Sequence, residues 1–144
     1  LMAANLEIKP GTGVLLSIAD QNKAEAVSLI RDLTNAGCLL YATEGTAAMI
    51  SAMGLSVSMT TKRLSEGHPN VVDVIEDGSV SAVVNTISGS PEVMRDGFYI
   101  RRAAVEKHIP CFTSMDTARA AAESMSVELA SYDIATISEY LKAD

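Results

Sequence analysis

Short apolar runs alternate with segments of helical periodicity along most of this 144-residue chain. The runs are rich in Val, Ile, Leu and Ala, and each is followed by apolar residues that recur every three to four positions. The expected strands are 14–19, 38–42, 55–59, 80–85 and 109–113, and the expected helices are 23–36, 46–53, 70–77, 99–107 and 116–124. Strands that alternate with helices and are apolar throughout their length form parallel sheets with both faces covered. The sequence therefore predicts an α/β fold with a parallel sheet between helices.

Charge and hydropathy exclude several classes of function. The net charge of −7 argues against general nucleic-acid binding, which depends on Lys and Arg to neutralise phosphates. No apolar run approaches the roughly 20 residues of a membrane span, and no basic-then-apolar leader opens the chain, so we expect a cytoplasmic protein without a membrane partner. Cys38 and Cys111 lack the spacing of a metal site. We expect both to be buried thiols in a reduced compartment.

The turn from Tyr41 to Ala48 is the strongest candidate for a binding site. An apolar run ends there at Thr43, and a helical pattern begins at once through Gly45 and Thr46. The first turn of a helix has unpaired N–H groups and partial positive charge, which attract phosphate and carboxylate groups. The alternative is that the threonines only cap the helix. We interpret this turn as an anion-binding site.

Polar residues also end the other expected strands. Ser17 lies late in the first strand, and Lys23 lies in the first turn of the helix after it. A lysine at that position opposes the helix dipole by about 0.3–1 kcal/mol, so it suggests a nearby anion, although a solvated surface lysine is the alternative. Lys62 follows the third strand, and Asn85 and Thr86 end the fourth. Ligands of such folds bind beyond the carboxyl ends of the strands, so we expect these groups to form a phosphate pocket.

The remaining polar candidates are less specific. Arg101 and Arg102 are either solvated or face the pocket or a partner domain, and His68 lies in a loop near the pocket. No Ser-His-Asp or Cys-His arrangement and no carboxylate pair can be assigned. We therefore assign no catalytic residue and no metal ligand.

Several motifs together resemble the methylglyoxal synthase-like domain family. The turn Ala42-Thr43-Glu44-Gly45-Thr46-Ala47 is the mark of this family. The motifs of the whole resemblance are Ser17-Ile18-Ala19-Asp20 with Lys23, this turn, Lys62, Glu66-Gly67-His68-Pro69-Asn70 with Asp73, Asn85-Thr86 with Gly89, Arg95-Asp96-Gly97 and Ile100-Arg101-Arg102-Ala103-Ala104. The loop containing His68 and the helix with its paired arginines are similar to one branch, the carboxyl-terminal allosteric domain of the carbamoyl-phosphate synthase large subunit.

The resemblance implies a three-layer α/β/α sandwich with a five-stranded parallel sheet, and we assign this domain to residues 13–126. From the sequence pattern we expect a lead-in segment at 1–12 and a helical extension at 127–144. It implies no catalysis and no cofactor in this domain. Other units of the parent synthase make carbamoyl phosphate from bicarbonate, glutamine-derived ammonia and ATP with Mg or Mn, for pyrimidine and arginine biosynthesis.

The implied ligand is a nucleotide monophosphate, with uridine monophosphate as inhibitor and inosine monophosphate as activator in bacterial relatives, and ornithine in many relatives. The implied partners are the catalytic domains and the glutaminase small subunit, with possible homo-oligomers. The matching effector positions, with Gly45 added from the turn, are Ser17, Lys23, Thr43, Gly45, Thr46, Lys62, Asn85 and Thr86. His68, Asp73, Arg101 and Arg102 are candidates for supporting the site or for a domain interface.

Two positions depart from the family patterns. Ile87 stands where bacterial relatives often have a second Thr, which leaves the choice of effector open. His68 stands where true methylglyoxal synthases have the catalytic Asp, and Asp73 lies one turn further on. The general base for isomerisation is therefore absent, which argues against the alternative function, a stand-alone lyase that acts on dihydroxyacetone phosphate. A third interpretation, the cyclohydrolase half of a bifunctional purine enzyme, shares fewer motifs.

Overall fold

Five parallel strands form one sheet in the order β3-β2-β1-β4-β5. The computed structural model describes residues 8–60, 70–86 and 91–125, with side chains described except at 91–97. The strands are β1 Gly13–Ser17, β2 Leu39–Thr43, β3 Ser58–Thr60, β4 Ala82–Asn85 and β5 Cys111–Phe112. The register pairs Ser17 with Asn85 and Thr43 with Thr60, so that neighbouring strands end at one edge.

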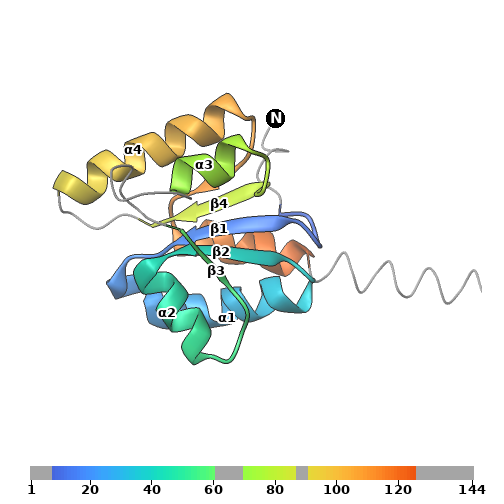
Figure 1. Cartoon of the computed structure of the whole chain (residues 1–144). Coiled ribbons are helices and arrows are strands. Elements are labelled where there is room, and N and C mark those ends of the chain that lie inside the picture. The colour runs from blue at the N-terminus through green and yellow to red at the C-terminus, as the bar shows by residue number, and fades with distance from the viewer. Residues whose placement is uncertain (1–7, 61–69, 87–90, 126–144) are drawn as a thin grey trace, which may run out of the picture.

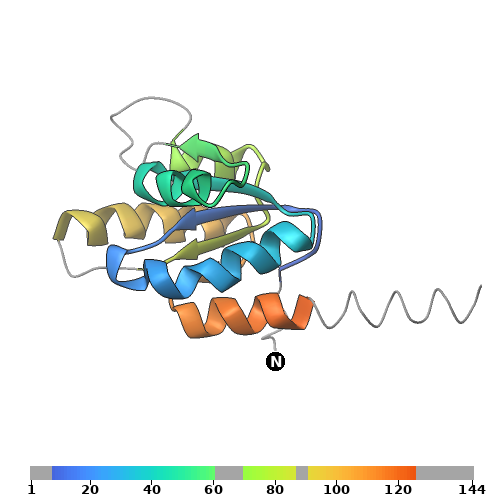
Figure 2. The ribbon, with the colours of Figure 1, turned by 90° about the horizontal axis from the view of Figure 1, so that it is seen from below.

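Helices cover both faces of this sheet (Figures 1 and 2). The helices are α1 Lys23–Asn35, α2 Glu44–Ala52, α3 Val71–Glu76, α4 Pro91–Glu106 and a helix at 115–125, with a short 3-10 turn, η2, at Asp20–Asn22. In Figure 1, α3 and α4 lie on one side of the sheet, while α1, α2 and the helix at 115–125 lie on the other. The expected three-layer α/β/α sandwich is confirmed.

The alternation of side chains along β1 explains the two hydrophobic cores. Val14 and Leu16 pack with α1, α2 and the helix at 115–125, whereas Leu15 packs with α3 and α4. Successive residues of a strand point to opposite faces, so a strand that is buried on both sides is apolar at every position. Packing against helices on both faces holds β1 in place, and with it the position of Ser17 at the end of the strand.

The start of α4 differs from the expectation. We expected a helix at 99–107, but α4 begins at Pro91 and ends at Glu106. Proline is favourable in the first turn of a helix because the N–H that it lacks would be unpaired there. Gly97 lies inside the helix, where glycine costs about 1 kcal/mol relative to alanine, and this cost did not end the helix.

Parts of the prediction lie outside the described residues. The predictions that cannot be compared with the structure concern Lys62, His68, Ile87 and the expected extension at 127–144. Within the described ranges, no helix is long and apolar enough to cross a membrane.

Candidate anion-binding site

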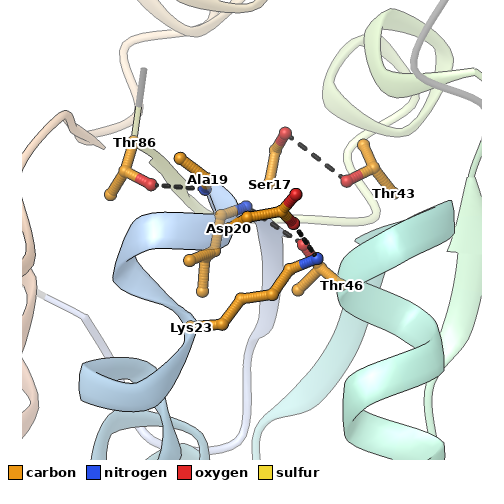
Figure 3. Close-up of polar contacts among 8 residues, drawn as sticks. Ser17, Ala19, Asp20, Lys23, Thr43, Thr46 and Thr86 are labelled. Carbon is orange, nitrogen blue, oxygen red and sulfur yellow. Dashed lines mark hydrogen bonds and ion pairs between the residues drawn. The ribbon is translucent and has the colours of Figure 1, made fainter. Parts of the chain in front are cut away.

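Three buried polar side chains meet at the carboxyl-terminal edge of the sheet. Ser17, Thr43 and Asn85 are the last residues of β1, β2 and β4, and we call them the strand-end cluster. Their exposed fractions are 3%, 6% and 2%. Thr43 Oγ1 donates a hydrogen bond to Ser17 Oγ at 3.4 Å (Figure 3). Polar groups of this kind are costly to bury without partners, so their concentration at one edge needs an explanation.

The side chain of Thr43 does not cap α2. Thr43 occupies the N-cap position with extended backbone angles, but it makes no side-chain capping hydrogen bond. Its hydroxyl turns toward Ser17 instead. Thr43 is thus the N-cap residue of α2 by its backbone, but its hydroxyl is not the cap that the alternative requires. The amides at the start of α2 are not occupied by this side chain, and they add partial positive charge to the strand-end cluster.

Two threonines hold the segment that joins β1 to α1. The backbone N–H of Ile18 donates to Thr46 Oγ1 at 3.0 Å, and that of Ala19 donates to Thr86 Oγ1 at 2.8 Å (Figure 3). Both hydroxyls act here as acceptors, and each retains its own O–H to donate. Thr46 and Thr86 thus tie this segment to α2 and to the end of β4.

Lys23 extends from the start of α1 toward the start of α2. Its Nζ lies 2.6 Å from Asp20 Oδ1 (Figure 3). The same Nζ lies 3.1 Å from the position that a Cβ would take on Gly45, in the first turn of α2. A glycine at this position leaves room for the ammonium group beside the helix terminus. Lys23 and Gly45, which the sequence analysis names as effector positions, are therefore neighbours in the structure.

The amide nitrogen of Asn85 lacks a partner. Nδ2 is fully buried and makes no hydrogen bond with any described group. A buried donor without a partner costs about 1–3 kcal/mol, and such groups in native proteins call for a specific explanation. Since the nitrogen lies in the strand-end cluster, an acceptor brought by a ligand would satisfy it.

The other predicted residues lie elsewhere or serve a different role. Asp73 forms a capping box with Asn70 at the start of α3: Asp73 N donates to Asn70 Oδ1, and Asn70 N donates to Asp73 Oδ2. Arg101 and Arg102 are exposed on α4, where Arg102 Nε lies 3.4 Å from Glu106 Oε1. The structure thus gives Asp73 a helix-capping contact and places neither arginine in the strand-end cluster.

Both cysteines are free thiols. Burial raises the pKa of Cys38, which two backbone hydrogen bonds partly oppose, and burial likewise raises the pKa of Cys111, which the charge of Arg101 partly opposes. Raised values are typical of unreactive structural thiols. No group of three potential metal ligands occurs among the residues whose positions are given.

One residue of the site was missed from the sequence. Asp20 was not predicted as a site residue, but it is the ion-pair partner of Lys23. The signal was the spacing of three residues between opposite charges, which brings side chains together in a helical turn.

Comparison with known proteins agrees with this architecture. A family model described as MGS-like domain matches residues 25–113. The carbamoyl phosphate synthase large chain of Thermomicrobium roseum is 49% identical over 119 residues, which cover 83% of this chain and 11% of that protein. The chain thus spans about a tenth of the length of this relative. By the family match and by its five-stranded parallel sheet between helices, the chain belongs to the MGS-like domain family.

Proposed function

We propose that this domain is the regulatory domain of a carbamoyl-phosphate synthase large chain and that it binds a phosphorylated nucleotide effector at the carboxyl edge of its sheet. The identity of 49% to a protein of that name supports the parent enzyme. The parent would use ATP with Mg or Mn and ammonia from a glutaminase subunit. This domain would contribute ligand binding and no chemical step.

The observation that carries the proposal is the unpartnered amide of Asn85. Its buried Nδ2 lies at the end of β4, and Asn85 is the register partner of Ser17 at the end of β1. A helix N-terminus and a lysine attract a phosphoryl group through charge, which falls off slowly with distance. A buried amide donor is directional and adds a defined hydrogen bond to an oxygen of the ligand. Together these groups suit a small phosphate monoester.

Regulation would follow from a difference in affinity. A ligand shifts the parent enzyme between two states only as far as it binds one of them more tightly. Coupling free energies of this kind are typically about 1–3 kcal/mol, or about 5- to 150-fold in affinity. The exposed Arg101 and Arg102 on α4 are candidates for contacting the catalytic domains.

The test is calorimetric titration of this chain with uridine monophosphate, inosine monophosphate, ornithine and, as a control without phosphate, uridine. We expect binding of at least one nucleotide and none of uridine at the same concentration. Asn85→Leu keeps the shape of the side chain and removes the amide. We expect this variant to lose about tenfold or more in nucleotide affinity, which corresponds to one hydrogen bond to a charged group.

Unfolding in urea controls for damage to the fold. Because Asn85→Leu removes an unpartnered buried donor, its unfolding free energy should not fall. Equal affinity of the variant and the original chain would contradict the assignment of Asn85. Release of phosphate from dihydroxyacetone phosphate by the isolated chain would favour the lyase alternative over the regulatory proposal.

A further inference from the structure

We propose that Asp20 is an intramolecular competitor of the phosphoryl ligand: it pairs with Lys23 in the ligand-free domain and thereby lowers the affinity of the site. The inference rests on the proposed function, because it concerns the same anion site. It assigns to Asp20 the role of setting affinity, which the family resemblance does not supply.

The geometry of the pair supports competition. Asp20 lies in η2, three residues before Lys23, and the pair closes at 2.6 Å between Oδ1 and Nζ. The side chain of Lys23 is 27% exposed, whereas that of Asp20 is 94% exposed. The carboxylate therefore approaches the ammonium group from the solvent side, the side from which a soluble anion would arrive. Ion pairs with an exposed member are weak, because water screens them, and they can be exchanged.

The charges near Lys23 explain why a carboxylate is needed in the free state. Its ammonium group lies 3.1 Å from the position of a Cβ on Gly45, at the positive end of α2. The ammonium group and the partial positive charge of this helix terminus repel each other, and the carboxylate of Asp20 compensates both when no ligand is present. A phosphoryl group brings its own negative charge to the same place. Asp20 then becomes a second negative group beside it, and must leave Lys23.

Two consequences distinguish competition from simple positioning. If Asp20 competes, its neutralisation increases affinity, whereas if Asp20 orients Lys23 for the ligand, its neutralisation decreases affinity. Repulsion between Asp20 and the ligand also grows with the charge of the ligand. A dianion should therefore gain more than a monoanion from the loss of Asp20.

The experiment compares the chain with Asp20→Asn and with a matched control, Glu106→Gln. Glu106 is paired with Arg102 on α4 at 3.4 Å, so its variant also removes one negative charge from an exposed pair but leaves Lys23 unchanged. Inorganic phosphate, uridine monophosphate and a cyclic uridine monophosphate, which carries a single charge, are titrated by calorimetry at low salt and about pH 8, where phosphate monoesters are dianions.

We expect Asp20→Asn to bind inorganic phosphate and uridine monophosphate about two- to fivefold more tightly, the range that corresponds to exposed ion pairs. The cyclic nucleotide should gain less, and Glu106→Gln should match the original chain. Weaker or unchanged binding of phosphate by Asp20→Asn would overturn the inference, as would an equal gain in Glu106→Gln. If phosphate binding responds as expected while neither nucleotide binds, the proposed effector is wrong and the competition by Asp20 stands. If no form of the chain binds phosphate or either nucleotide, both proposals fail.

Discussion

Replacing Thr46 by Val should destabilise the domain although the two side chains have nearly the same shape. Thr46 is 1% exposed, and its Oγ1 accepts a hydrogen bond from the backbone N–H of Ile18 at 3.0 Å. Ile18 is itself 6% exposed, so water cannot readily replace the lost acceptor. A buried donor left without a partner costs about 1–3 kcal/mol, and we expect a loss of unfolding free energy in this range.

Thr34 provides a control with the same chemical change. Its Oγ1 is buried and makes no hydrogen bond with any described group, and the residue lies in α1. Thr34→Val removes a polar atom that gains nothing from burial, and Val and Thr have similar helix propensities. This variant should therefore be neutral or more stable by up to about 1 kcal/mol.

Urea unfolding followed by circular dichroism measures both changes. The urea concentration at the unfolding midpoint should fall for Thr46→Val and should stay the same or rise for Thr34→Val. The m-value should be unchanged in both variants. Each 1 kcal/mol corresponds to about 2–8 °C in melting temperature for domains of this size range. If the two variants lose the same free energy, the hydroxyl of Thr46 does not hold the segment between β1 and α1.

Two further predictions concern Gly45 and the thiols. Gly45→Ala places a methyl group 3.1 Å from Lys23 Nζ. Alanine is the better helix former, so the unfolding free energy should hold or rise, while calorimetry should show phosphate affinity lower by about tenfold, the loss of one hydrogen bond to a charged group; unchanged affinity would place Lys23 outside the site. Burial raises the pKa of Cys38 and Cys111 above the ordinary 9.0, so the folded state keeps these protons longer than the unfolded state. The contribution of these protonated thiols to stability is complete below pH 9.0. It is lost as the pH rises from there through the pKa values that the thiols have in the folded state. Urea unfolding between about pH 8 and pH 10.5 should therefore show a steeper loss of stability than in a variant with both cysteines replaced by Ala, and parallel profiles would contradict the burial argument.

The sequence predicted most elements because their patterns are local. The run from Val14 to Ala19 is apolar at nearly every position, as expected of a strand covered on both faces, and β1 was found close to this place. The start of α4 was missed by eight residues, because Ser, Gly and Pro are typical of loops while Pro91 is also suited to a first helical turn. A local pattern cannot distinguish these two uses of proline.

The sequence by itself determined the parallel sheet and the presence of Ser17, Thr43 and Asn85 at its carboxyl edge, because parallel strands that follow one another through helices must end on the same side. The tertiary structure decided what each polar atom does there. Thr46 and Thr86 accept from backbone groups 28 and 67 residues away, which no local pattern encodes. The missing partner of Asn85 and the placement of Lys23 beside Gly45 likewise arise only when separate elements pack together. Hydrogen bonds and charges depend on distance in space, whereas strands and helices depend mainly on neighbours along the chain.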